Sequence, residues 1–145
     1  MQDFSPVKIL LVEDNPGDVR LIIEALKDSK IYNTLDVVED GPDALEYLHK
    51  QGKYAAKATP DLILLDFDLP TLSGKEVLEQ VKTHKDLRVI PVIVLTVSQS
   101  EQDILRAYHL QANAYVNKPI DLDQFISIVR SIENFWFTIL KLPGR

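Results

Sequence analysis

Short apolar runs alternate along this chain with segments in which apolar residues recur every three or four positions. The runs have the length and composition of buried strands, and they cover residues 7–12, 35–38, 62–65, 92–95 and 114–116. The segments between them have the period of amphipathic helices, with apolar positions at Val19, Ile22, Ile23, Leu26, Ala44, Leu45, Leu48, Val77, Leu78, Val81, Ile104, Leu105 and Tyr108. A last helix begins near Asp121, and its core-facing stripe is predicted at Leu122, Phe125, Ile126, Val129, Ile132 and Trp136.

This alternation of strand and helix predicts an α/β domain built on a parallel sheet. Parallel strands need right-handed crossovers, which place helices on both faces of the sheet. We expect a single domain over residues 1–145, with a core at about 7–131 and with 132–145 extending the last helix into a tail. The longest predicted loop, at 51–59, is polar and precedes the third strand.

Composition and charge exclude several classes of protein. The formal net charge is −6, which argues against a nucleic-acid partner because such proteins carry a basic patch. The chain has no cysteine, and therefore no disulfide framework or thiolate nucleophile. No apolar run approaches the roughly 20 residues that span a bilayer, and the first residues do not have the layout of a signal peptide. We therefore expect a soluble, cytoplasmic protein without a membrane partner.

Polar side chains follow four of the five predicted strands. Glu13 and Asp14 end the first, Asp66 the third, Thr96 the fourth and Lys118 the fifth. Ligands of such sheets bind outside the carboxyl ends of the strands. We therefore expect three carboxylates, a hydroxyl and an ammonium group to converge at one edge.

Three neighbouring carboxylates repel one another, and a divalent cation removes the conflict. All-oxygen ligands suit magnesium, or a similar ion such as manganese. Asp66 ends the central strand and is the predicted phosphoryl acceptor, while Lys118 and Thr96 are placed to contact phosphoryl oxygens. Each residue taken alone is more often a turn, a helix cap or a solvated charge, but the joint occurrence of all five favours a site.

The motifs that carry these residues resemble the receiver domains of two-component response regulators. They are LLVEDN at 10–15, DLILLDFDLP at 61–70 followed by Gly74, VIVLT at 92–96 and YVNKP at 115–119. The resemblance implies a flavodoxin-like, doubly wound, five-stranded parallel sheet of order 2-1-3-4-5. It also implies self-catalysed phosphotransfer from a histidine kinase to Asp66 and slow autodephosphorylation, without enzymatic turnover of other substrates.

The same resemblance assigns further roles. Magnesium would be held by Asp14, Asp66 and the backbone carbonyl of Asp68, with Glu13 bound through water. Thr96 and Tyr115 would form a switch pair, in which the ring follows the hydroxyl inward on phosphorylation; Tyr115 is otherwise a strand aromatic in the core. The bond between Lys118 and Pro119 would be cis, which an X-Pro bond permits.

A narrower resemblance connects the chain to the single-domain response regulators that partner cyanobacterial phytochromes. It rests on the loop with Gly52 and Tyr54 and on residues 104–113 and 132–143, and it implies a phytochrome-like histidine kinase. Two positions depart from common patterns. Asp68 stands where this subgroup often has Asn, which adds negative charge near the site. Gln111 stands where receivers generally have Gly, at a cost of about 1 kcal/mol if the backbone is left-handed.

The tail carries more large apolar residues than one core-facing stripe needs. Phe135, Phe137, Leu140 and Leu142 predict a homodimer interface on the last helix and tail, with a contribution from the fourth predicted helix and the fifth predicted strand. The alternative is that the tail folds back on its own domain.

Three other functions compete with the receiver hypothesis. Asp66, Asp68 and Thr71 approximate the motif of aspartyl-phosphate phosphatases, but Thr71 falls one residue too late. A phosphorylation-independent interaction module would not need the complete set of polar residues. A flavin carrier would need a glycine- and hydroxyl-rich phosphate loop, and residues 13–18 are acidic instead.

Overall fold

The computed structural model describes residues 6–29, 31–97 and 101–133, and five strands within them form one parallel sheet. The order across the sheet is β2-β1-β3-β4-β5. The strands are β1 (Val7–Val12), β2 (Asn33–Val38), β3 (Leu62–Asp66), β4 (Val92–Thr96) and β5 (Ala114–Asn117). This is the predicted fold class and strand order.

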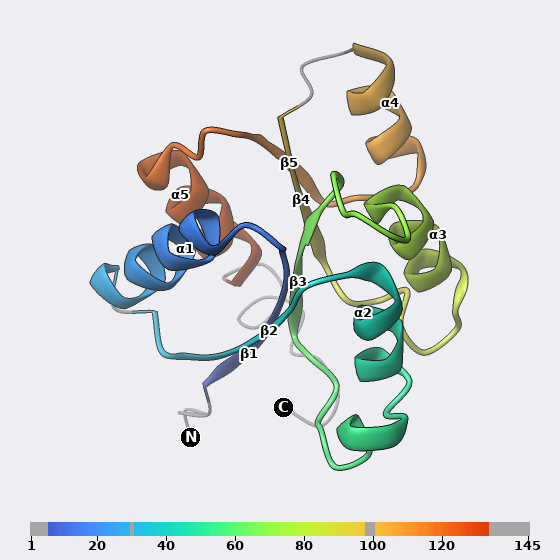
Figure 1. Cartoon of the computed structure of the whole chain (residues 1–145). Helices are drawn as coiled ribbons and strands as arrows, with labels where there is room; N and C mark the ends of the chain where they lie inside the picture. Colours follow the sequence, from blue (N-terminus) through green and yellow to red (C-terminus); the bar gives the residue numbers. More distant parts are fainter. Residues whose placement is uncertain (1–5, 30, 98–100, 134–145) are drawn as a thin grey trace.

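Helices cover both faces of the sheet (Figure 1). One layer holds α1 and α5, and the other holds α2, α3 and α4. Their bounds are α1 (Pro16–Asp28), α2 (Gly41–Leu48), α3 (Gly74–Thr83), α4 (Glu101–His109) and α5 (Leu122–Glu133), with a short 3-10 helix, η1 (Gly52–Tyr54), in the predicted loop. Within the described ranges, no helix combines the length and apolar character that a membrane crossing requires.

The three inner strands supply the core. All five residues of β3 and all five of β4 are buried, as a strand covered on both faces requires. Alternate residues of β1 point to opposite faces, so Leu10 and Val12 join the cluster under α2 and α3 while Ile9 and Leu11 join the one under α1 and α5. The apolar runs therefore fix both the sheet and its two helix layers.

Several element boundaries and one core position differ from the predictions. β3, β4 and β5 each end one residue later than predicted, at Asp66, Thr96 and Asn117. β2 begins at Asn33 rather than at residue 35, because the backbones of Asn33 and Thr34 pair with Val7 and Lys8 of β1 although their side chains are polar. Leu122, placed in the core stripe of the last helix, is 37% exposed, whereas Phe125 and Val129 are buried. An edge strand and the first turn of a helix both tolerate such exceptions, since neither is enclosed on all sides. Trp136 lies outside the described residues.

Gly74 lets α3 begin directly against the end of β3. A Cβ atom at this position would lie 2.3 Å from the carbonyl oxygen of Asp66 and 2.6 Å from Cα of Phe67, which no side chain can occupy. Ser73 caps the helix by accepting a hydrogen bond from the Glu76 amide at 3.3 Å. The loop that carries Asp68 is therefore closed by a contact that only glycine allows.

Gln111 has a left-handed backbone, with φ of 70°. We expect Gln111→Gly to raise the free energy of unfolding by up to about 1 kcal/mol, because glycine relieves the Cβ strain of this conformation. Gln80→Gly, at an exposed position inside α3, is the control and should lower it by about 1 kcal/mol. Urea denaturation measures both, and a loss of stability in Gln111→Gly would contradict the prediction.

Candidate functional site

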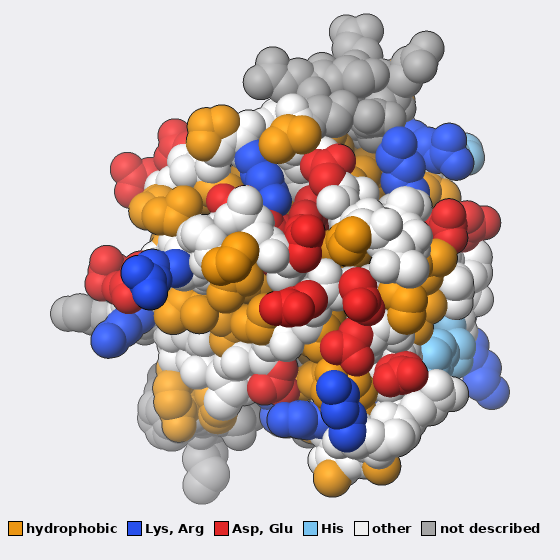
Figure 2. Space-filling model, in the orientation of Figure 1, with side chains coloured by type: hydrophobic (Ala, Val, Ile, Leu, Met, Phe, Trp, Pro, Cys, Tyr) orange, Lys and Arg blue, Asp and Glu red, His pale blue; other side chains and the backbone are white. Residues whose placement is uncertain are grey.

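Parallel pairing brings the ends of β1 and β3 side by side. Val12 pairs with Leu65, so the residues that follow them, Glu13 and Asp66, lie next to each other at the carboxyl edge of the sheet. Carboxylate oxygens of Glu13, Asp14 and Asp66 all lie within 4.8 Å of one another. Acidic side chains gather in the middle of the face seen in Figure 2, between the two helix layers. The structure thus brings together the carboxylates that the sequence singled out.

The cluster places two buried carboxylates next to an exposed one. Glu13 is 0% and Asp66 1% exposed, whereas Asp14 is exposed to solvent. Burial, and next the close approach of Asp66, hold the pKa of Glu13 well above its usual range, although Lys118 acts in the opposite direction. Oε2 of Glu13 is buried and accepts no hydrogen bond from a described residue. An all-oxygen, charge-dense set of this kind fits a divalent cation.

Lys118 reaches this cluster from the end of β5. Its Nζ is paired with Oε1 of Glu13, lies 3.0 Å from Oδ2 of Asp18 and lies 3.6 Å from Oδ2 of Asp66. Burial works against the ammonium charge, but these carboxylates outweigh it and hold the pKa of Lys118 above its ordinary value. The bond between Lys118 and Pro119 is cis, as predicted.

Asp18 is a site residue that sequence reasoning missed. It lies in the first turn of α1, where its amide donates a hydrogen bond to the Asn15 side chain at 3.1 Å. Its carboxylate contacts Lys118, 100 residues further along the chain, at 3.0 Å. The available signal was an acidic residue in the first turn of the helix that begins directly after the carboxyl end of β1.

Thr96 is buried at the end of β4, and its hydroxyl has a partner that the sequence did not predict. It donates a hydrogen bond to Oδ2 of Asp68 at 3.0 Å, and the Val97 amide donates to the same oxygen at 3.2 Å. The Asp68 amide in turn donates to Oδ1 of Asp66 at 2.8 Å. From the sequence, the side chain of Asp68 was expected only to add negative charge near the site. In the structure it connects the loop after β3 to the end of β4.

Tyr115 of β5 lies beside the residue that follows Asp66. Its half-buried ring packs against the core cluster under α3. The ring meets Phe67, the residue after Asp66, edge to face with centroids 6.5 Å apart. Tyr115, the predicted switch partner of Thr96, thus contacts the first residue of the loop that follows Asp66.

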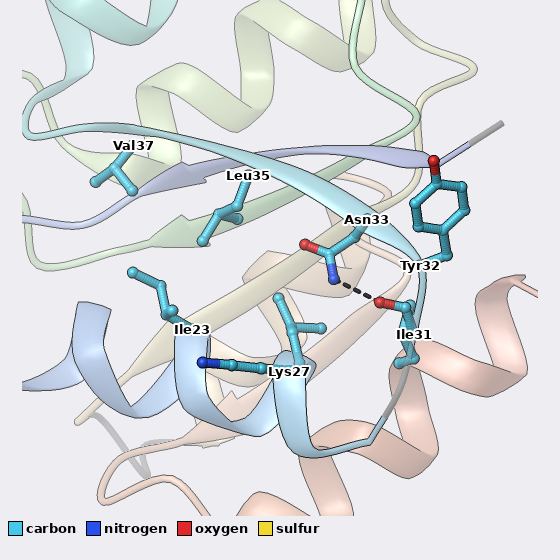
Figure 3. A pocket seen from close by; sticks show the side chains of 8 residues that line it. Ile23, Lys27, Ile31, Tyr32, Asn33, Leu35 and Val37 are labelled. Carbon is cyan, nitrogen blue, oxygen red and sulfur yellow. Dashed lines mark hydrogen bonds between the residues drawn. The ribbon is translucent and has the colours of Figure 1, made fainter.

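A concave surface lies between α1 and β2 and contains none of the predicted site residues (Figure 3). Its volume is about 450 Å³, and its walls are apolar except for Lys27 and Asn33. Ile23 and Lys27 reach it from α1, and Leu35 and Val37 from β2. The carboxyl edge therefore remains the place where charged groups converge.

The arrangement matches known proteins over most of the chain. A family model described as the response regulator receiver domain matches residues 9–130. Response regulator Rcp1 of Synechocystis sp. is 44% identical over 139 residues, which cover 96% of this chain and 95% of that protein. The probable methanogenesis regulatory protein FilR2 of Methanothrix harundinacea is 38% identical over 141 residues, covering 96% and 89%.

Solved structures show the same similarity. The phosphorylated cyanobacterial phytochrome response regulator RcpA is 45% identical, with a TM-score of 0.82 over 97% of this chain and 100% of that chain. The Mn(2+)-bound form of Rcp1 is 43% identical, with a TM-score of 0.81 over 96% and 100%. By the extent of the matched region and by these identities, the chain belongs to the response regulator receiver family.

Proposed function

We propose that this chain is a single receiver domain, residues 1–145, that accepts a phosphoryl group on Asp66 from the phosphohistidine of a histidine kinase. One observation carries the assignment: the buried carboxylate of Asp66 is contacted from two sides. Nζ of Lys118 lies 3.6 Å from its Oδ2, and the Asp68 amide donates a hydrogen bond to its Oδ1 at 2.8 Å. A carboxylate oxygen of Asp66 would bond to phosphorus as the bond from phosphorus to the kinase histidine nitrogen breaks. The product is an acyl phosphate on Asp66 and a free imidazole on the kinase.

Asp14, Asp66 and the backbone carbonyl of Asp68 are the proposed ligands of a divalent cation, with Glu13 bound through water. Magnesium or manganese held there would neutralise the charge of the carboxylates and of the arriving phosphoryl group. The clustered oxygens and the unsatisfied Oε2 of Glu13 support this assignment. Lys118 is held within reach of the same oxygens by Glu13 and Asp18, and it would bind a phosphoryl oxygen as a point charge.

Thr96 and Tyr115 are the proposed switch. The hydroxyl of Thr96 would donate to a phosphoryl oxygen, and the ring of Tyr115 would follow it into the space that it leaves. The half-buried ring and its contact with Phe67 support the proposal, because a side chain that is only partly enclosed can change its position without opening the core. The exposed part of Tyr115 would carry the change to a partner.

The partners follow from the relatives and from the charge. Rcp1 and RcpA support a phytochrome-like histidine kinase as the phosphodonor, since RcpA is a phytochrome response regulator. Phe135, Phe137, Leu140 and Leu142 lie outside the described residues, and we retain them as the proposed homodimer interface. The net charge of −6 argues against a nucleic-acid partner. A cytoplasmic location, without a membrane partner and without enzymatic turnover of a separate substrate, remains part of the proposal.

Incubation with acetyl phosphate and magnesium should add one phosphoryl group to the wild-type protein and none to Asp66→Asn. The reason is that the amide of Asn cannot act as the nucleophile, while its size keeps the fold intact. Intact-mass spectrometry makes the measurement, and a receiver known to react serves as the positive control. Equal phosphorylation of both proteins, or none under conditions where the control reacts, would refute the proposal.

Magnesium chloride should raise the melting temperature of the wild-type protein. A ligand that binds only the folded state stabilises it by about 2.7 kcal/mol at a concentration 100 times its Kd. The rise should disappear in Asp14→Asn and persist in Asp123→Asn, which removes a carboxylate on α5 away from the cluster. Differential scanning fluorimetry with and without the salt measures it, and an undiminished rise in Asp14→Asn would reject the proposed ligand set.

A chain that ends after Ser131 should be monomeric if the tail forms the dimer. The double variant Phe135→Ser, Phe137→Ser should weaken the dimer without shortening α5. It therefore distinguishes the loss of apolar contacts from the loss of the end of the helix. Light scattering and sedimentation of all three proteins at equal concentrations measure the association. If the truncated protein is as dimeric as the full chain, the tail does not form the interface.

A further inference from the structure

The carboxylate of Asp68 has a role that metal binding does not account for. The proposed metal ligand at this position is the backbone carbonyl, which leaves the side chain available. Its Oδ2 accepts two hydrogen bonds, from the Thr96 hydroxyl at 3.0 Å and from the Val97 amide at 3.2 Å. Thr96 ends β4 and Val97 follows it, whereas Asp68 belongs to the loop after β3. The contact therefore joins the acceptor loop to the strand that carries the proposed switch.

These two donors lie beside the acceptor carboxylate. Asp66 pairs with Leu95 across β3 and β4, so Thr96 is one residue beyond the end of that pairing and Val97 is two. The amide of Asp68 already donates to Oδ1 of Asp66 at 2.8 Å. The Asp68 carboxylate is thus held next to the Asp66 carboxylate, which would receive the phosphoryl group. Its two hydrogen-bond donors, from Thr96 and Val97, lie at the same edge of the sheet.

We propose that Asp68 is a positioning residue whose carboxylate stands in for a phosphoryl oxygen in the unphosphorylated protein. It holds the Thr96 hydroxyl and the Val97 amide until a phosphoryl group on Asp66 displaces it. This inference rests on the proposed function of Asp66. It adds an internal competitor, supplied by the same loop as the acceptor, to the proposed switch.

Charge and burial support an exchange of one anion for another. A carboxylate oxygen and a phosphoryl oxygen are both anionic acceptors, and charge-assisted bonds to either are stronger than bonds between neutral groups. Thr96 is 1% exposed, so its hydroxyl would pass from one anion to the other without losing an acceptor in the interior. Asp68 is exposed, so its carboxylate can be hydrated after release. The exchange leaves no buried polar group unsatisfied.

Competition lowers the apparent affinity of the site for a phosphoryl group. If the binding-competent arrangement is only a fraction of the population, the apparent Kd rises by the inverse of that fraction. Removing the Asp68 carboxylate should therefore tighten the binding of a phosphoryl analogue. Most of the gain should depend on Thr96, because its hydroxyl makes the shorter of the two hydrogen bonds to the competitor.

The contact itself is tested without metal or phosphodonor. In the nuclear magnetic resonance spectrum of the wild-type protein, the Val97 amide proton should appear downfield, as expected for a bond to a carboxylate. It should move upfield in Asp68→Ala and lie between the two in Asp68→Asn, which keeps the size and one acceptor oxygen. A Val97 resonance that Asp68→Ala leaves unchanged would overturn the proposed contact, whether or not Asp66 can be phosphorylated.

The competition is tested with beryllofluoride and magnesium by titration calorimetry. Asp68→Ala should bind beryllofluoride about tenfold more tightly than the wild type, and in a Thr96→Ala background the gain should fall below about threefold. Glu76→Gln removes an acidic side chain from the start of α3 and should leave the affinity within about twofold, as a control for charge. An equal gain in both backgrounds would show simple charge repulsion, and no gain would show no competition; either result would overturn the proposal.

Discussion

The pairing of one largely enclosed ammonium with two buried carboxylates is the interaction on which the site depends. Glu13 and Asp66 are enclosed at the carboxyl edge of the sheet, where a charge without a partner would cost on the order of several kcal/mol. Lys118 contacts both, and Asp18 contacts Lys118 from α1. A cation is thus built into the site before any metal or phosphoryl group arrives. The remaining excess of negative charge is what suits the edge to a divalent ion.

The sheet makes this concentration of charge possible. Parallel pairing aligns the carboxyl ends of β1, β3, β4 and β5, so residues far apart in sequence are placed within a few ångströms by backbone hydrogen bonds alone. The buried strands beneath the edge hold those ends rigidly, because β3 and β4 are covered on both faces. Gly74 completes the frame by letting α3 approach the backbone of Asp66. The chemistry is therefore supported by packing on every side except the one open to solvent.

One side of the site is held by hydrogen bonds rather than by apolar packing. Asp68 is exposed, Tyr115 is half-buried, and the Thr96 hydroxyl donates a hydrogen bond to Asp68. Such contacts can be exchanged for others of equal strength, whereas a buried apolar contact is lost without replacement when it opens. A rigid edge next to an exchangeable set of hydrogen bonds is a suitable arrangement for a switch.

The sequence by itself determined the fold class, the strand order through its resemblance to receivers, and the convergence of Glu13, Asp14 and Asp66. These features follow from periodicity and from the fact that parallel strands end at one edge. Only the tertiary structure decided the partner of each polar group. The contact between Asp18 and Lys118 and that between Thr96 and Asp68 join residues 100 and 28 positions apart, and their direction depends on side-chain rotation that no pattern of spacing encodes. The exposure of Leu122 and the paired polar start of β2 were likewise set by what surrounds each element, because burial depends on neighbours that the local sequence does not contain.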